Sequence, residues 1–225
     1  MTLSLTARCP ETGQLGIAIS SSSMAVGSRC PLAAARRGGR FPARILPCRR
    51  WGRRSSARSR RGASVEQAMK QALAEDRFRE YRQVAAIDAN GDTAVFSGEF
   101  TLGIGGALAG DNCVAAGNML DSQGVIAAMV GAFEAATGEL ASRLLAGLRA
   151  GIVAGGEAGP VHSAAVKVVD DYPWPVVDLR IDWAEADPLT ALEQLWLAWE
   201  PQMEAYITRA LDPREAPAYG VPGDE

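Results

Sequence analysis

Thr2 is the residue whose type and position carry the most specific chemistry in this sequence. Removal of Met1, which the small threonine side chain should allow, would make Thr2 the N-terminal residue. A terminal threonine carries a nucleophilic hydroxyl and a free amine on one residue. Because an α-amino group has a pKa of about 7.7–8.0, a sizeable fraction is neutral near physiological pH and can accept the hydroxyl proton, directly or through a water. Such a catalyst needs no histidine, which suits a chain with a single histidine, His162.

Other patterns that could support chemistry are weak. No Walker A, GxGxxG, HExxH or GxSxG motif is present. The glycine-rich run 103–106 lacks the Lys-Ser/Thr pair of a phosphate loop, and His162 beside a strand start is more typical of a structural role. Carboxylates near strand ends are more typical of turns and solvated faces than of an acid/base pair or metal site; they are Asp170, Asp171, Asp178 and Asp182. We therefore expect no metal and no cofactor.

Composition narrows the class of protein. Of 225 residues, 48% are apolar and 22% are charged, as in an ordinary globular protein. The sequence contains no run of 18 apolar residues, so we expect no transmembrane helix. The first residues lack the pattern of a signal peptide. The four cysteines stand far apart with no CxxC pair, which argues against a disulfide framework or structural zinc; they are Cys9, Cys30, Cys48 and Cys113. We expect a protein of the reducing cytoplasm that does not associate with membranes.

The basic residues are unevenly placed. No acidic residue lies between Glu11 and Glu66, although the net charge is −3. Eleven of the 23 basic residues fall within 34–61, and the rest of the chain has 12 basic and 26 acidic residues, a balance of −14. The eleven are Arg36, Arg37, Arg40, Arg44, Arg49, Arg50, Arg53, Arg54, Arg58, Arg60 and Arg61.

Three interpretations of residues 34–61 remain open: a patch for nucleic acid or an anionic membrane, a solvated loop, or a frame shift in a GC-rich gene. Read two nucleotides along, degenerate codons for residues 40–52 permit the peptide VSSxNxTLPALG, a strand-like run with a polar turn. We favour the frame shift and consider nucleic-acid binding the weakest of the three. Eleven cations without acidic partners in the segment cannot be buried, so we expect poor packing and exposed arginines.

The elements that must position Thr2 follow from hydrophobic periodicity and turn signals. Alternation predicts a first hairpin over residues 2–20, with serines 20–23 at its end. Ser64 and Gln67 form a capping box that opens a helix. Asn90-Gly91 predicts a second hairpin with a type I′ turn. The remaining expected elements are a strand at 112–116, a helix capped by Asp121 or Ser122, a helix at 140–152, strands at 161–169 and 176–183, and a helix opened by Asp187-Pro188.

Hairpins dominate this order, so the pattern predicts an α+β fold with mainly antiparallel sheets and helices packed on them. The sequence shows no internal repeat and no second domain. We expect one domain over residues 1–211, followed by a flexible tail, 212–225.

Several separated segments resemble a known family. In the opening of the chain, the residues that match the first hairpin of that family are Thr2, Ser4, Thr12-Gly13, Leu15-Gly16 and Ser20. Leu3 stands where the family has an aromatic residue. Further matches are Ala116-Gly117-Asn118-Met119-Leu120, His162-Ser163-Ala164-Ala165 and Val177-Asp178-Leu179-Arg180-Ile181-Asp182, followed by Asp187-Pro188. On these residues the chain resembles domain-of-unknown-function family 1028, over about residues 1–30 and 62–200. The resemblance fails at 34–61, where the out-of-frame peptide is similar to the family's own segment.

The family is similar in fold to the N-terminal-nucleophile (Ntn) hydrolases. The resemblance therefore implies a four-layer αββα sandwich, a homo-oligomer, and Thr2 at the end of the first strand as nucleophile. An amide or peptide-like small substrate is implied, with Asn118 and backbone N–H groups at the oxyanion and Ser21 or Ser22 orienting the amine. A catalytically inactive binding or assembly module of the same fold is the alternative, because a fold does not fix a function.

Overall fold

A computed structural model describes residues 2–33, 43–45 and 63–221 of the chain. The strands are β1 (Thr2–Arg8), β2 (Leu15–Ser21), β3 (Pro31–Leu32), β4 (Ala43–Ile45), β5 (Gln83–Ile87), β6 (Thr93–Ser97), β7 (Gly106–Gly110), β8 (Cys113–Asn118), β9 (Ser163–Val169) and β10 (Pro175–Ile181). The helices are α1 (Val26–Arg29), α3 (Val65–Ala74), α4 (Gly124–Ala135), α5 (Leu140–Val153), α6 (Pro188–Trp199) and α7 (Met203–Leu211), with single 3-10 turns at Arg79–Tyr81 and Glu200–Gln202. The mixed α+β class predicted from the sequence is confirmed.

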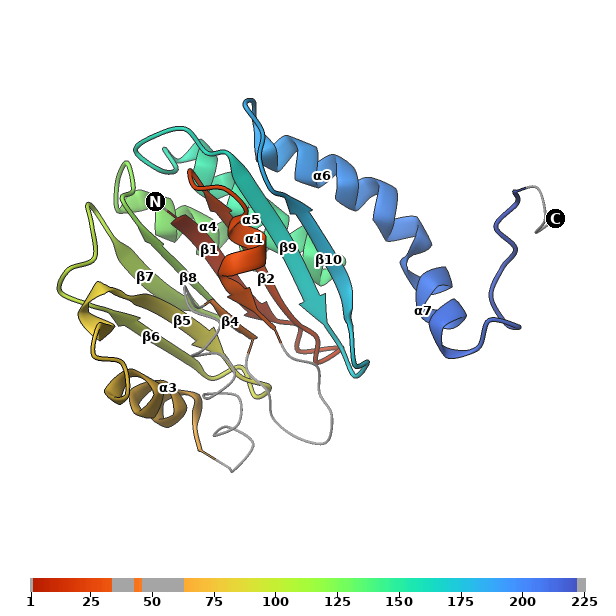
Figure 1. Cartoon of the computed structure of the whole chain (residues 1–225), viewed down its shortest axis with the longest axis horizontal. Coiled ribbons are helices and arrows are strands. Elements are labelled where there is room, and N and C mark those ends of the chain that lie inside the picture. The colour runs from red at the N-terminus through yellow and green to blue at the C-terminus, as the bar shows by residue number, and fades with distance from the viewer. Residues whose placement is uncertain (1, 34–42, 46–62, 222–225) are drawn as a thin grey trace.

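A six-stranded sheet forms the centre of the molecule (Figure 1). Its order is β10-β9-β2-β1-β8-β7, and every neighbouring pair is antiparallel. The first strand, β1, therefore lies in the middle, between its hairpin partner β2 and the distant β8. This arrangement places the start of β1 beside the ends of β2 and β8.

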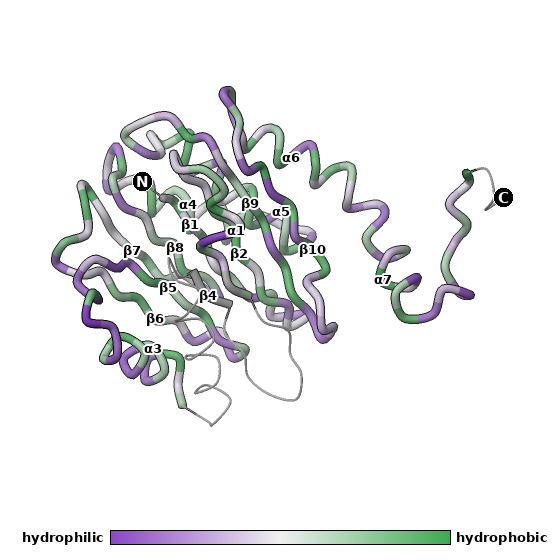
Figure 2. The backbone as a smooth tube through the Cα atoms, in the orientation of Figure 1, coloured by the Kyte–Doolittle hydropathy of each residue, from purple (hydrophilic) through white to green (hydrophobic). Residues whose placement is uncertain are grey.

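The alternation of side chains along β1 separates two environments. Leu3, Leu5 and Ala7 are fully buried in the main core. Thr2, Ser4 and Thr6 therefore face the opposite side of the sheet. Hydrophobic residues run along the strands of this sheet and the helices that cover it, whereas the turns and much of α3 are hydrophilic (Figure 2).

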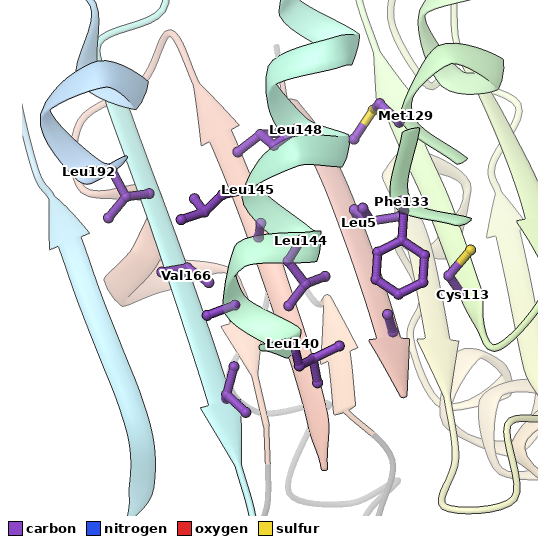
Figure 3. Packing of buried hydrophobic residues seen from close by; sticks show 14 of the residues in the cluster. Leu5, Cys113, Met129, Phe133, Leu140, Leu144, Leu145, Leu148, Val166 and Leu192 are labelled. Atoms are coloured by element: carbon purple, nitrogen blue, oxygen red, sulfur yellow. The ribbon is translucent and has the colours of Figure 1, made fainter. Parts of the chain in front are cut away.

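Helices α4 and α5 cover the side of the sheet that carries Leu3 and Leu5. In Figure 3, the Phe133 ring of α4 lies beside Leu5, and Met129 of α4 with Leu144 and Leu148 of α5 belongs to the same core. All of these side chains are fully buried. At the edge beyond β10, α6 packs on β9 and β10 and is tied to α5 through Arg149, whose guanidinium bonds Asp187 and Glu193.

A four-stranded sheet, β3-β4-β5-β6, lies against the other side of the six-stranded sheet. Ala85 of β5 packs on Val114 and Ala116 of β8. On its far face, β5 contributes Val84 and Ala86 to a second core with α3. A further cluster between the sheets joins Ile87 of β5 to Leu15 of β2 and Val169 of β9, and the polar side of β1 faces the same space.

Several predicted boundaries agree with the structure and others do not. The capping box of α3 is formed, since Ser64 Oγ accepts from the Gln67 amide and Gln67 Oε1 accepts from the Ser64 amide. The second hairpin exists, but Asn90 lacks the positive φ that a type I′ turn needs. The buried Asp88 carboxylate instead accepts from the amides of Asn90 and Asp92 and holds a wider turn.

The predicted cap of α4 is wrong. The residue that precedes α4 is Gln123, with no side-chain hydrogen bond, rather than Asp121 or Ser122. Asp121 donates its amide to the Gly156 carbonyl, and Leu120 forms a bridge with Glu157. Leu120 and Asp121 are therefore bound to the 155–157 loop, and Asp121 does not cap the helix.

Strand β7 was not predicted. Its sequence, Gly-Ala-Leu-Ala-Gly, has little intrinsic preference for a strand, and the edge of the sheet recruits it through pairing with β8.

Within the arginine-rich segment, the structure describes only 43–45. These residues form β4, which pairs with β3 and β5, a strand that the expectation of poor packing did not include. The frame-shift interpretation and the expected exposure of the arginines concern residues that lie outside the described ranges. Of the tail predicted to be flexible, 222–225 lies outside them as well. Among the described residues, no helix is long and apolar enough to cross a bilayer.

Candidate functional site

The start of β1 brings together three of the four predicted site residues. Thr2 is the first residue of β1 and stands directly opposite Asn118, the last residue of β8. Opposed residues of an antiparallel pair point to the same face, with Cβ atoms about 5 Å apart. On the other flank, Thr2 Oγ1 lies 3.4 Å from Ser21 Oγ at the end of β2. The topology thus places an amide and two hydroxyls at one point.

A cavity of about 120 Å³ opens beside this point, between the two sheets. The side chains that line it are neutral and come from both sheets and from the segments next to them: Thr2, Ser4, Cys30, Tyr81, Gln83, Ala85, Ala116 and Asn118. Burial raises the pKa of the Cys30 thiol, which keeps it protonated. The cavity can therefore hold a small, uncharged polar group next to the Thr2 hydroxyl.

Ser21 links Thr2 to a short chain of hydrogen bonds. Ser21 Oγ lies 2.8 Å from Ser23 Oγ and also accepts from the Ser23 amide. The Arg29 guanidinium, which can only donate, donates to Ser23 Oγ at 2.6 Å. With that end fixed, Ser23 can donate to Ser21 and Ser21 to Thr2 Oγ1.

Asn118 combines an unpaired atom with a strained neighbour. Its Oδ1 is buried and receives no hydrogen bond from the described residues. Buried acceptors without a donor are uncommon and require an explanation. Met119, which follows, has φ of 52°, an unfavourable value for a residue other than glycine. The backbone at the end of β8 is thus held in a costly conformation beside an amide that has an open position.

Ser22, the fourth predicted residue, contacts a carboxylate that the sequence analysis did not identify. The Ser22 amide donates to Glu157 Oε2 at 3.1 Å. Glu157 is only 6% exposed, and its Oε1 has no donor among the described residues. Burial raises the pKa of Glu157 to about 7, against the opposing effect of the hydrogen bonds from Ser22. A carboxyl group that titrates near neutrality therefore stands at the end of β2.

His162 and the paired aspartates do not join the site. His162 stacks on Trp183 with ring centroids 4.2 Å apart, and its Nδ1 lies 2.9 Å from the Ala184 carbonyl oxygen, as expected for a structural role. Asp178 pairs with Lys167 and Asp170 accepts from Gln14, at separate places on the sheet. No cluster of three potential metal ligands occurs among the described residues.

A larger cavity, of about 610 Å³, lies between α3 and β6. It is lined by apolar side chains such as Met69 and Leu73 and by charged ones such as Lys70 and Glu80. Its size exceeds that of the cavity at Thr2, but among the residues that the structure describes no activated nucleophile and no unpaired buried polar atom faces it. The chemistry therefore favours the smaller cavity.

Sequence reasoning found the residues of the six-stranded sheet and missed those that approach from elsewhere. Gln83 and Tyr81 reach the cavity only through the packing of one sheet on the other, which periodicity along a single strand does not specify. Glu157 lies within the glycine-rich stretch Gly155–Gly159, and a lone acid in a predicted loop gave no signal of burial.

The fold and the site together define an α+β protein with a threonine at the start of its central strand, beside a small cavity between two antiparallel sheets. The chain belongs to a family of unknown function, DUF1028, whose profile matches residues 2–192. It is similar to a protein of that family from Silicibacter pomeroyi, for which a crystal structure exists. That protein is 34% identical, with a TM-score of 0.79, and the match covers 88% of this chain and 85% of the other. No curated protein matches the chain significantly.

Proposed function

We propose that the protein is an Ntn-type amidohydrolase that cleaves an amide or peptide-like small substrate, with Thr2 as the nucleophile after removal of Met1. The observation that carries the proposal is the cavity at the start of β1, where the Thr2 hydroxyl lies next to the Asn118 amide. A nucleophile, a polar partner and open space are what an acyl-transfer site requires.

The layers of the molecule support this proposal. Helices α4 and α5 pack on one sheet, α3 packs on the other, and the two sheets face each other. We propose that this order is that of the four-layer αββα sandwich of Ntn hydrolases. In that fold the nucleophile stands at the end of a strand and faces the space between the sheets, and the position of Thr2 at the start of β1 supports the same role for it.

The reaction would follow from the groups at the site. Thr2 Oγ1 attacks the carbonyl carbon of the substrate, and its proton passes to the Thr2 α-amine. An N–H of the Asn118 amide, after a half-turn of that group, donates to the oxyanion. The amine returns the proton to the leaving nitrogen, the C–N bond breaks, and an ester of Thr2 remains. Water then hydrolyses the ester to a carboxylic acid and regenerates Thr2.

The hydroxyl chain would assist the first step. A hydrogen bond from Ser21 to Thr2 Oγ1 withdraws charge from the oxygen as its proton leaves, and Arg29 supports that donor through Ser23. The neutral lining of the cavity favours an uncharged acyl group of a few heavy atoms. We further propose a homo-oligomer in the cytoplasm, where the three described cysteines, which form no disulfide, would stay reduced.

The test compares the amidase activity of variants at Thr2 and Thr6, two threonines on the same face of β1. After intact mass has shown loss of Met1, a panel of small amides is assayed with wild-type protein, Thr2→Ala, Thr2→Ser and Thr6→Ala. We expect Thr2→Ala to lower kcat/KM by at least about 1000-fold and Thr2→Ser to keep part of the activity, since a hydroxyl and its amine remain. Thr6 lies on the same face of β1 but outside the cavity, so Thr6→Ala should stay near wild type.

Two results would reject the proposal. Full activity in Thr2→Ala would mean that another group attacks the substrate. Retention of Met1 would leave Thr2 without a free amine, and the alternative, an inactive binding or assembly module of the same fold, would then be preferred. Light scattering of the purified protein tests the oligomer, and a monomer at all concentrations would contradict it.

A further inference from the structure

Glu157 occupies a place that the reaction above does not use. One of its carboxylate oxygens accepts from Ser22, just after β2. The backbone of Glu157 bridges to Leu120, just after β8, and the next residue, Ala158, donates to the Met119 carbonyl oxygen. Because β1 lies between β2 and β8, a residue in contact with both flanks at this end lies across the start of β1. The α-amine of Thr2 would point in this direction.

The unpaired oxygen shows that Glu157 has room for another donor. Oε1 is buried and receives no hydrogen bond from the described part of the chain. A buried acceptor without a donor destabilises the fold, so a polar group that supplies an N–H there would be bound favourably. Glu157 also forms no ion pair with any described lysine or arginine, whereas exposed acids such as Asp182 and Asp212 do.

From this geometry we infer that Glu157 is a positioning residue: its Oε1 accepts an N–H from the Thr2 α-amine and holds that amine against the Thr2 hydroxyl. The inference rests on the proposed function, because the amine exists only after Met1 has been removed. The carboxylate would then stabilise the ammonium that forms when the amine takes the hydroxyl proton. It would act on the amine as the aspartate acts on the histidine of a serine protease triad.

The surroundings of Glu157 favour this pairing over others. The neighbouring titratable side chains are Asp121, which lies beside Gly155, and His162, which precedes β9. Asp121 is an acid and cannot neutralise a carboxylate, and the His162 ring is stacked on Trp183 next to the Ala184 carbonyl. Burial raises the pKa of Glu157, and the positive charge of the amino terminus of the chain opposes that rise. Its place across the start of β1 identifies the Thr2 amine as the missing partner.

The pKa of the Thr2 amine tests the inference without any substrate. Reductive methylation with ¹³C-formaldehyde labels the amines of the Met1-free protein, and NMR follows their titration. The chain has only two lysines, Lys70 and Lys167, so the spectrum contains few amine signals besides that of the α-amine. We expect Glu157→Gln to lower the pKa of the Thr2 amine by about one unit, since a nearby carboxylate favours the ammonium form. The matched control, Asp121→Asn, removes a neighbouring exposed carboxylate and should leave that pKa unchanged.

An unchanged amine pKa in Glu157→Gln, or an equal shift in both variants, would overturn the inference. If Glu157→Gln does not fold, wild-type protein gives the answer. Carbamylation of the Thr2 amine by cyanate removes its charge and should raise the pKa of the Glu157 carboxyl. NMR of protein labelled with ¹³C-glutamate measures that pKa. No change in that pKa would also overturn the inference.

Failure of the inference can be distinguished from failure of the proposed function. Suppose that the amine pKa depends on Glu157 but Thr2→Ala keeps full activity. The contact between Glu157 and the amine would then stand, and the role of Thr2 as nucleophile would be rejected. If Thr2→Ala loses activity but Glu157→Gln leaves the amine pKa unchanged, Thr2 would stand as the nucleophile and the contact with Glu157 would be rejected. If both hold, the acid limb of the kcat/KM profile of Glu157→Gln should move to lower pH by about the shift of the amine pKa, a change that a purely structural role would not produce.

Discussion

At the scale of single residues, the Asn118 amide is the group whose chemistry can be isolated most cleanly. If its N–H donates to the oxyanion, its contribution appears in the transition state and not in substrate binding. We expect Asn118→Ala to lower kcat by about 100- to 1000-fold with little change in KM. Asn90→Ala, in the exposed turn after β5, is the matched control. A rise in KM with unchanged kcat would show that Asn118 only binds the substrate.

The residues of this site differ in how far the sequence could predict them. Thr2 was identifiable from its own chemistry. The resemblance to a family implied that Asn118 belongs to the same site, but the register that pairs the two residues comes from the structure. Ser21 was identifiable as the end of a strand. Glu157 was not, because its burial depends on Leu120 and the end of β2, which the fold brings to the same place from distant parts of the chain.

At the scale of elements, the contact between α5 and the central sheet depends on a glycine. A Cβ on Gly147 would overlap Leu5 and stand 3.0 Å from the Met129 carbonyl oxygen. Alanine favours a helix over glycine by about 1 kcal/mol, but the overlap costs about 1–3 kcal/mol. We therefore expect Gly147→Ala to lower the free energy of unfolding, measured by urea denaturation.

Gly131 in α4 provides the control for this prediction. A Cβ at Gly131 would meet nothing within 4 Å, so Gly131→Ala should gain up to about 1 kcal/mol of stability through helix propensity alone. If Gly147→Ala stabilises the protein as much as Gly131→Ala does, the packing of α5 on β1 is looser than the structure indicates.

The elements themselves were predictable where the pattern was local. The first hairpin, the capping box of α3 and the Asp187-Pro188 start of α6 all follow from residues within one or two turns of chain. Strand β7 and the start of α4 were not predictable, since pairing with β8 and contacts with the 155–157 loop determine them. Long-range contacts determine the secondary structure of such segments, and their own amino-acid composition does not predict those contacts.

At the scale of the whole molecule, the site exists only while the two sheets stay together. Two apolar clusters join them: Ala85 packs on Val114 and Ala116, and Ile87 packs on Leu15 and Val169. Gln83 adds a polar link across the interface. Its Nε2 donates to the Gly117 carbonyl oxygen at 2.9 Å, from the four-stranded sheet to the six-stranded one. Since Gln83 also lines the cavity with Thr2, this link supports the site directly.

Gln83→Met tests whether that link matters, because methionine keeps the length of the side chain and removes the donor. Loss of the hydrogen bond leaves a backbone carbonyl between the sheets without this donor, which should cost about 1–3 kcal/mol of unfolding free energy. Hydrogen exchange should also quicken in β5 and β8, the strands that face each other across the cavity. Gln123→Met, at an exposed position before α4, is the matched control. If both variants lose the same stability and exchange alike, the apolar contacts alone hold the sheets together, and the cavity beside Thr2 keeps its shape without Gln83.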